Sequence, residues 1–132
     1  LALVKVQDRG RVVAFHQGNE LTPGERVDAI GHPKRRLFSI TRGVVSAVRK
    51  LSSHSLGGRE VLYVQTDADL NPGNSGGPLF KGDKVVGVNA WAELHGRVTS
   101  GEKSVIVPAP GLNFAVHYAE AKRFLDEAMK GE

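Results

Sequence analysis

The sequence of 132 residues contains no cysteine. Disulfide-stapled scaffolds, thiolate metal sites and a cysteine nucleophile are therefore excluded. Aromatic residues are also sparse, with one tryptophan, two tyrosines and five phenylalanines. They do not interleave with the basic residues in the way that a surface for stacking nucleic-acid bases requires. We therefore expect no nucleic-acid partner.

Long apolar runs are missing as well. The longest apolar stretches are far shorter than the ~20 residues that a membrane-spanning helix requires, and no segment has the pattern of a signal peptide. The chain carries a net charge of +4, but its basic residues are scattered except at Lys34-Arg35-Arg36. Such a trio is more typical of a solvated loop than of a site for an acidic partner. We expect no membrane span in this chain.

Glycine and proline are plentiful instead, with 16 and six residues respectively. They indicate many turns and short elements, which favour an all-β fold. Hydrophobic residues make up 40% of the chain and charged residues 24%. These values are typical of a single globular domain with a core of its own.

Short segments rich in apolar and β-branched residues recur between the turns. We expect strands at Leu1–Val6, Arg11–Phe15, Glu25–Ile30, Phe38–Lys50, Glu60–Thr66, Pro78–Lys81, Lys84–Trp91 and Leu112–Val116. The pair around Gly82-Asp83 is a predicted hairpin. Residues between Ala92 and Pro110 are expected to form a long polar connection, with at most a short strand at Ser104–Val107. Tyr118–Met129 has apolar residues at helical spacing. Some seven strands and a final helix suggest a small closed barrel.

The segment Gly73-Asn74-Ser75-Gly76-Gly77 is the candidate for chemistry. A serine between glycines in a tight turn is exposed and held in a fixed place. Gly73 lets the backbone turn so that its N–H and that of Ser75 can converge on one point, which would make an oxyanion hole. A glycine- and asparagine-rich turn with an incidental serine has the same composition. The five residues alone leave both interpretations open.

The wider sequence resembles the trypsin-like serine proteases of the chymotrypsin fold, and among them the Deg/HtrA branch. The resemblance covers nearly the whole chain, through Leu1–Val6, Arg26–Pro33, Thr41–Ser46, Gln65–Pro78, Val86–Ala90 and Leu112–Val116. It implies that the chain is the second half of a protease domain. Residues 1–6 would be the last strand of the first barrel, and residues 25–132 would form the second barrel, six-stranded and antiparallel, with the terminal helix.

The resemblance also implies roles for individual residues. Ser75 would be the nucleophile, Gly73 and Ser75 would supply the oxyanion amides, and Asn74 would belong to the oxyanion loop. Substrate would lie along the edge strand Val88-Asn89-Ala90. The pocket for the residue before the cleaved bond would be lined by Asp69–Pro72, with Asp69 and Leu70 foremost, by Asn89–Trp91, and by Leu112, Asn113 and Phe114.

Two positions differ between trypsin and the Deg/HtrA branch. Asn74 stands where digestive trypsins have aspartate, so activation by a freed N-terminal amine is not implied. Asp69 lies six positions before Ser75, where trypsin has the aspartate at the floor of its pocket. If Asp69 faces the pocket, cleavage after Lys or Arg is expected; if it faces solvent, the small aliphatic preference of the Deg/HtrA branch is expected. The Leu70-Asn71-Pro72 run favours the solvent-facing interpretation.

The general base that such an enzyme needs has no match in the chain. The catalytic histidine is expected well upstream and the aspartate just before Leu1, so we expect the isolated chain to be inactive. None of His16, His32, His54, His95 and His117 matches the family's base. The alternative is a trypsin-fold peptide-binding or regulatory module that does not cleave.

Expected partners follow from the same resemblance. They are a peptide or unfolded-protein substrate, the missing N-terminal half of the protease domain, and further copies of the chain in a homo-oligomer. No cofactor and no metal are expected. The family favours the bacterial periplasm or cell envelope.

Overall fold

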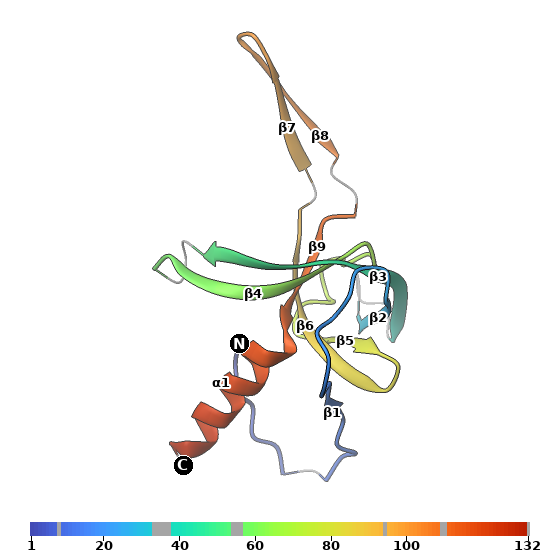
Figure 1. Cartoon of the computed structure of the whole chain (residues 1–132), viewed down its shortest axis with the longest axis vertical. Helices are drawn as coiled ribbons and strands as arrows, with labels where there is room; N and C mark the ends of the chain where they lie inside the picture. Colours follow the sequence, from blue (N-terminus) through green and yellow to red (C-terminus); the bar gives the residue numbers. More distant parts are fainter. Residues whose placement is uncertain (8, 33–37, 54–56, 94, 109–110, 132) are drawn as a thin grey trace.

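Figure 1 shows a computed structural model of the chain, which describes residues 1–7, 9–32, 38–53, 57–93, 95–108 and 111–131. The elements are β1 (Ala14–Phe15), β2 (Arg26–Gly31), β3 (Ser39–Ser53), β4 (Arg59–Thr66), β5 (Pro78–Lys81), β6 (Lys84–Ala92), β7 (His95–Ser100), β8 (Lys103–Pro108), β9 (Asn113–His117) and α1 (Tyr118–Lys130).

Six strands form a closed ring in the order β6-β5-β2-β3-β4-β9, because β9 pairs with both β4 and β6. All six pairings of the ring are antiparallel. β1 adds a short parallel pairing to β6. The ring confirms the predicted six-stranded antiparallel barrel, and closure removes the open edges that a flat sheet would expose.

The core fills the inside of this ring. Apolar side chains alternate with polar ones along the strands, so that one face of each strand turns inward. On β2, for example, Val27 and Ala29 are fully buried, whereas Arg26 is exposed. The other core residues are Leu21, Val45, Val64, Leu70, Leu79, Val86 and Ala115. Each buried valine or leucine stabilises the fold by roughly 1.5–3 kcal/mol.

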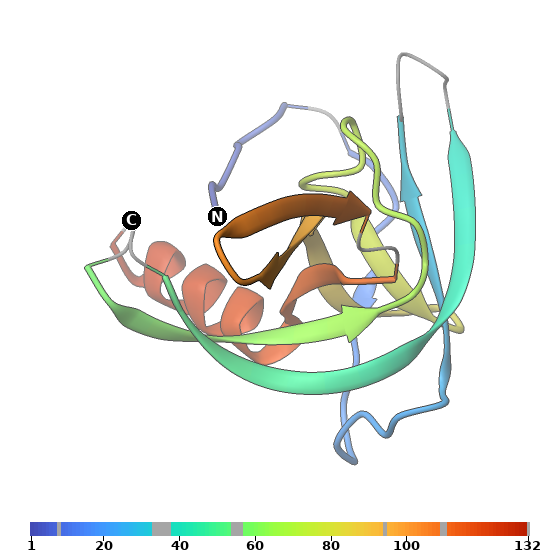
Figure 2. The same cartoon turned by 90° about the horizontal axis from the view of Figure 1, so that it is seen from above.

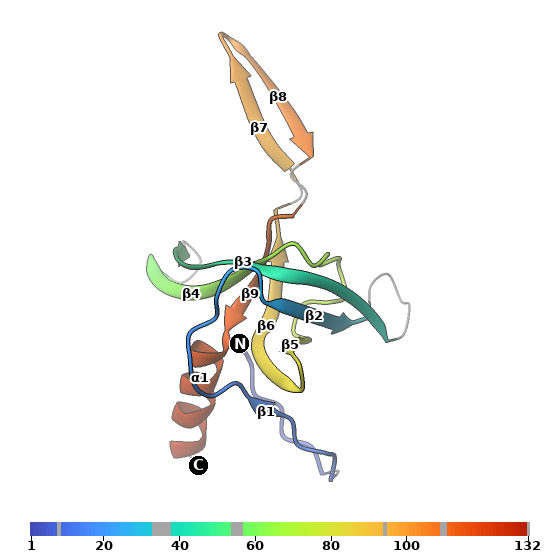
Figure 3. The same ribbon diagram turned by 45° about the vertical axis from the view of Figure 1, so that its right-hand side comes forward.

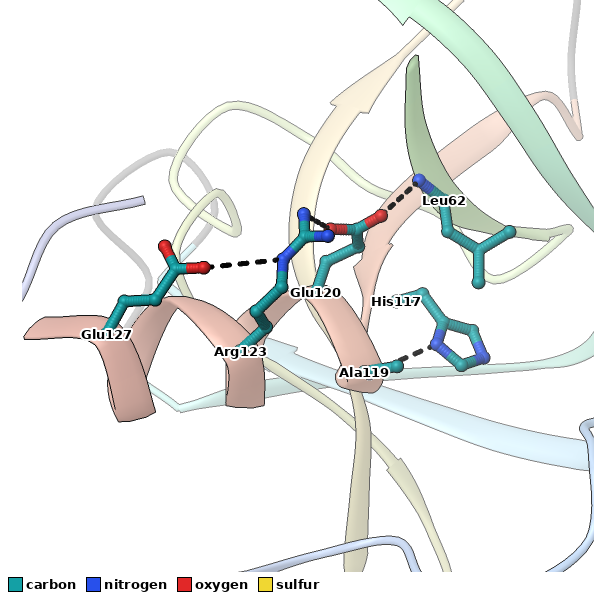
Figure 4. Close-up of polar contacts among 6 residues, drawn as sticks. All are labelled: Leu62, His117, Ala119, Glu120, Arg123 and Glu127. Atoms are coloured by element: carbon teal, nitrogen blue, oxygen red, sulfur yellow. Dashed lines mark hydrogen bonds and ion pairs between the residues drawn. The ribbon is translucent and has the colours of Figure 1, made fainter. Parts of the chain in front are cut away.

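The C-terminal helix follows directly after β9 and confirms the predicted helix, with one residue more at its end. His117 caps it, since its Nδ1 accepts a hydrogen bond of 3.1 Å from the Ala119 amide. The Glu120 carboxylate accepts from the Leu62 amide of β4 at 3.1 Å, which ties the helix to the barrel (Figure 4). Arg123 pairs with this carboxylate as well.

The N-terminal segment differs from the prediction. Residues 1–7 form no strand, and their side chains are exposed. Apolar residues such as Leu3 and Val4 favour a strand only where a neighbour pairs with the backbone and covers the side chains. The assignment of residues 1–6 to a first barrel stays a prediction.

The connection between β6 and β9 also differs from the prediction. In place of a polar loop, β7 and β8 pair as an antiparallel ribbon whose register includes Val98↔Val105 and Ser100↔Lys103. Gly101 stands at the turn with a φ of +61°. Figures 1 and 3 show the ribbon projecting from the barrel beyond β6 and β9. Figure 2, seen from above, places α1 on one side of the molecule and the β2–β3 pair on the opposite side.

Candidate active site

Two consecutive turns hold Ser75 between β4 and β5. The Asn74 amide donates to the Asn71 carbonyl at 3.0 Å, and the Gly77 amide donates to the Asn74 carbonyl at 3.0 Å. Gly73 and Gly76 have φ of +107° and +84°, a region that other residues rarely adopt. Ser75 therefore lies at an exposed corner of the chain, as the spacing of the glycines predicts.

The end of β2 fixes one flank of this corner. Asn74 is buried and packs against Gly31, where an added Cβ would lie only 2.4 Å from Asn74 Oδ1 and 2.7 Å from its Cα. The His32 amide donates to the Gly73 carbonyl at 3.1 Å. The glycine at position 31 is thus required by a close approach, and the approach sets the position of the turn that precedes Ser75.

β3 fixes the beginning of the same loop. The Asp67 carboxylate accepts from the Val44 amide at 2.7 Å, and the Thr66 hydroxyl donates to the Val44 carbonyl at 2.7 Å. Gly43 leaves no room for a side chain, because its Cβ would lie 2.3 Å from the Ala68 nitrogen. The residues that lead into the loop are therefore anchored at the backbone of a long strand.

A buried asparagine of β9 joins the loop to β4. Asn113 Oδ1 accepts from the Leu70 amide at 3.2 Å, and its Nδ2 donates to the Thr66 carbonyl at 3.2 Å. Leu70 itself is buried in the core. Asp69 lies beside it but is exposed, and its carbonyl accepts from the Thr41 hydroxyl at 2.7 Å.

β6 forms the wall next to Ser75. The Gly76 amide donates to the Asn89 carbonyl at 2.7 Å, and the Asn89 amide donates to the Gly77 carbonyl at 2.8 Å. A β-bulge between Asn89 and Trp91 leaves Ala90 without a partner in β9. The Ala90 carbonyl accepts from the Ser75 hydroxyl at 2.9 Å. The bulge thus gives Ser75 a direct contact with β6, and bulges commonly lie next to active sites.

The amides of Gly73 and Ser75 have no acceptor in the part of the protein that the structure describes. Within the described residues neither donates a hydrogen bond, whereas the Asn74 amide between them does. Both lie in exposed residues of the loop. They are therefore available for an oxygen atom of a ligand, and a loop that offers two such donors next to a hydroxyl suits acyl-transfer chemistry.

Residues 1–88 of the chain match the family described as "Trypsin-like peptidase domain". The chain belongs to this family. Serine protease Do-like HtrA of Bacillus subtilis is 43% identical over 140 residues, and the match covers 100% of this chain and 29% of that protein. Serine protease HTRA1 of Xenopus laevis is 35% identical over 133 residues, covering 97% of this chain and 26% of that protein.

A solved structure supports the same assignment. The crystal structure of the serine endoprotease from Yersinia pestis matches with a TM-score of 0.65 and 25% identity, over 90% of this chain and 36% of that chain. The chain is thus of the HtrA type of trypsin-like serine protease. It spans less than a third of the length of the Bacillus and Xenopus relatives.

A trypsin-like peptidase needs an imidazole beside its serine, and the three histidines whose side chains are described bond elsewhere. His16 Nε2 contacts the Asn19 carbonyl at 3.0 Å, and His32 Nδ1 accepts from the Phe38 amide at 3.1 Å. His117 caps α1, and burial lowers the pKa of its imidazole below the ordinary value. His54 and the side chain of His95 lie outside the described residues.

An aromatic cluster on this trypsin-like barrel was missed by the sequence reasoning. The Trp91 ring stacks on Phe114 with centroids 4.1 Å apart, and Tyr63 contacts both rings edge-on. Phe114 is buried beneath them, and its place in a pocket wall stays a prediction. Trp91 and Phe114 are register partners in β6 and β9. Pairing of these two predicted strands was the signal that could have found the cluster.

No group of three or more His, Asp or Glu side chains that could hold a metal ion is present in the described ranges. None of the described helical segments has the length and apolar character to cross a membrane.

Proposed function

We propose that the chain is the half of a serine endopeptidase domain that carries the nucleophile, and that Ser75 is this nucleophile. It would hydrolyse peptide bonds of a peptide or unfolded-protein substrate when joined to a half that carries the histidine and the aspartate. The observation that supports this most directly is the exposed Ser75 hydroxyl beside the bulge of β6, in a loop whose Gly73 and Ser75 amides donate no hydrogen bond within the described residues.

The chemistry follows from that position. The Ser75 hydroxyl leaves the Ala90 carbonyl, gives its proton to the imidazole of the other half, and Oγ attacks the carbonyl carbon of the substrate. The amides of Gly73 and Ser75 hold the oxyanion while the C–N bond breaks, and the imidazole returns the proton to the departing amine. Water then hydrolyses the acyl-enzyme by the same route in reverse, which restores Ser75.

The substrate's place follows from β6. Val88, Asn89 and Ala90 lie next to Ser75, and an extended peptide added to this strand gains backbone hydrogen bonds that do not depend on sequence. Leu70 and Leu112 stand in the adjoining loops, and Asn113 begins β9. In this proposal Asp69 faces solvent, because the residue is exposed, and preference for small aliphatic residues before the cleaved bond is retained.

A fluorophosphonate probe tests the nucleophile. We expect the full-length protein to be labelled at Ser75, with labelling lost in Ser75→Ala and retained in Ser104→Ala, an exposed serine of β8. Residues 1–132 alone lack a base in this proposal, and loss of triad members lowers the rate by about 10⁴-fold or more. Robust labelling of residues 1–132 alone would show that a histidine of this chain serves as base.

The second candidate is a peptide-binding module without catalysis. It is favoured by one contact, the hydrogen bond of the Ser75 hydroxyl to the Ala90 carbonyl, which leaves the hydroxyl directed to a group that cannot take its proton. A full-length protein that binds peptides but resists the probe would support this module and contradict the endopeptidase.

A further inference from the structure

The β7–β8 ribbon is a separate two-stranded sheet that lies beyond the end of the β6–β9 pairing. β6 and β9 pair as far as Ala92↔Asn113, and the Glu93 amide then donates to the Leu112 carbonyl at 2.8 Å. The first described pair of the ribbon is His95↔Pro108. β7 follows β6 in the chain and β8 precedes β9, and Figures 1 and 3 show the ribbon projecting beyond these two strands.

The order of the strands decides which edge of the ribbon is open toward the site. β9 occupies one side of β6, and β5 occupies the other side only as far as Pro78↔Val88. Beyond that pair, the side of β6 that carries the Ala90 carbonyl has no strand partner among the described residues, and Ser75 lies there. Because β8 pairs with β7 as β9 pairs with β6, we expect the free edge of β7 on the same side as the open edge of β6.

The ribbon also exposes several β-branched apolar side chains. Val98 and Val105 lie opposite each other on one face and are 56% and 59% exposed. Ile106, opposite Arg97 on the other face, is 65% exposed. A two-stranded ribbon is marginally stable alone in water, and exposed β-branched side chains along an unpaired edge are typical of a surface that receives a partner.

We propose that the β7–β8 ribbon is a docking arm for extended, unfolded polypeptide, which adds to the open edge of β7 as a further strand. This rests on the proposed function of Ser75. β6 runs from Ser75 toward β7, so a strand added antiparallel to it runs from the ribbon toward Ser75. The segment on the N-terminal side of the cleaved bond therefore lies along the arm.

The length and chemistry of β7 define the class of substrate. Its six residues span about 20 Å at roughly 3.3 Å per residue, which is enough for some six residues of substrate. Backbone pairing accepts any sequence, and alternate apolar side chains of the substrate would contact Val98 and Val105. A folded surface seldom offers such a free strand, so the arm selects unfolded chains with apolar residues well before the cleaved bond.

Peptide binding to the full-length protein with Ser75→Ala tests the arm without turnover. Two labelled peptides share the four residues before the bond, and the longer one adds ten residues with alternating valine and serine. We expect the longer peptide to bind at least about tenfold more tightly in fluorescence anisotropy. Val98→Thr with Val105→Thr keeps the shape and β-propensity but removes apolar surface, and should remove most of that gain while leaving the short peptide unchanged.

The matched control is Val12→Thr with Val13→Thr, the same change at two exposed valines before β1. This control should bind both peptides as the parent does. Equal binding of the long and short peptides by the parent would overturn the arm, as would an equal loss for both peptides in the ribbon variant. A change in oligomeric mass without a change in peptide binding would assign the ribbon to contacts between copies, and would also overturn it.

Turnover separates this proposal from the proposed function. With Ser75 present, hydrolysis of the short peptide tests the nucleophile, whereas length-dependent binding by Ser75→Ala tests the arm. A protein that hydrolyses nothing yet loses long-peptide binding with the valines would retain the arm and contradict the endopeptidase. A protein that hydrolyses both peptides equally well, both as the parent and with Val98→Thr and Val105→Thr, would support the endopeptidase and contradict the arm.

Discussion

The Ser75 loop and the β7–β8 ribbon are both connections between strands of one barrel, but they are held in different ways. The loop is fixed by contacts with β2, β3 and β9, which are the close approach of Gly31, the bond from the Val44 amide to Asp67, and the buried amide of Asn113. The ribbon is held by its own backbone ladder. A loop anchored from several strands keeps a hydroxyl in place, and its geometry is sensitive to single changes at distant positions. A ribbon with one ladder tolerates changes to its side chains.

The largest difference between the two regions should be in catalysis. Ser75→Ala removes the proposed nucleophile, so we expect hydrolysis of a short peptide by the full-length protein to fall by about 10⁴-fold or more. Thr99→Ala in the ribbon should leave the same rate within about twofold, because among the described residues its hydroxyl bonds with the exposed Ser104 alone. Steady-state kinetics on both variants provide the measurement. A large loss for Thr99→Ala would contradict the separation of the two regions.

Close packing at the loop should produce the next largest effect. Gly43→Ala places a methyl group against the backbone of Ala68, so the free energy of unfolding should fall by about 1–3 kcal/mol or more. The methyl group of Gly101→Ala at the ribbon turn would meet no atom within 4 Å. The change is disfavoured by the φ of +61°, which alanine rarely adopts. We expect that change to cost about 1 kcal/mol at most, and only locally. Urea denaturation of the two variants measures the loss in the free energy of unfolding. Equal losses would contradict the difference between the loop and the ribbon.

The buried amide of Asn113 offers a finer test. Asn113→Ala leaves the Leu70 amide and the Thr66 carbonyl without this partner, which should cost about 1–3 kcal/mol and loosen the loop. Ser104→Ala removes one exposed hydroxyl contact in the ribbon and should cost under about 0.5 kcal/mol. Hydrogen exchange of the loop amides checks the local effect. Unchanged exchange in Asn113→Ala would show that the loop is held without that residue.

The helix cap predicts a pH dependence that neither region shares. Burial keeps the pKa of His117 below its ordinary value of 6.5, so the folded state binds fewer protons than the unfolded state. Its contribution to stability is present above pH 6.5 and is lost as the pH falls below that value. Protonation also removes the Nδ1 acceptor of the cap, which is worth about 1 kcal/mol.

The measurement is the thermal midpoint between pH 7 and pH 5. That window lies above the range of Asp28, whose carboxyl pKa is lowered from 3.8 chiefly by its hydrogen bond with Arg42. His117→Asn keeps a capping oxygen but cannot titrate there, so its midpoint should change less over the window. An identical slope for both proteins would remove His117 as the cause.

The smallest expected effect is at Asp69. Because this residue is exposed, Asp69→Ala in the full-length protein should leave the preference before the cleaved bond unchanged. A peptide library compares the two proteins. A preference for Lys or Arg that disappears in the variant would place the carboxylate in the pocket, as in trypsin.

Local patterns in the sequence predicted the parts of the fold that rest on local physics. The hairpin of β5 and β6, the alternation in β4 and the spacing of α1 are each properties of neighbouring residues. The glycines around Ser75 predicted its exposed turn for the same reason. The run of short strands suggested a closed barrel, and the resemblance added its six antiparallel strands.

The remaining features depend on contacts between distant residues. Asn113 and the Thr66 carbonyl, or Gly43 and the Ala68 nitrogen, meet only after the strands have paired. The ribbon was missed because Gly96, Arg97 and Thr99 give β7 no clear alternation, and because nothing in the barrel covers it. Leu1–Val6 shows the converse, since apolar composition predicted a strand that has no partner here.

The ribbon also has a consequence for how the ring closes during folding. β9 is the last strand in the chain and pairs with both β4 and β6, so the ring stays open until β9 arrives. Without the ribbon, the residues between Ala92 and Asn113 would be a free loop, and the entropy of closing it would oppose the β6–β9 pairing. A hairpin nucleated at Gly101 forms in about 1–10 μs and brings Leu112 back to Glu93. Formation of the ribbon thereby brings β9 next to β6. Lengthening the turn at Gly101 should slow refolding more than it lowers the free energy of unfolding.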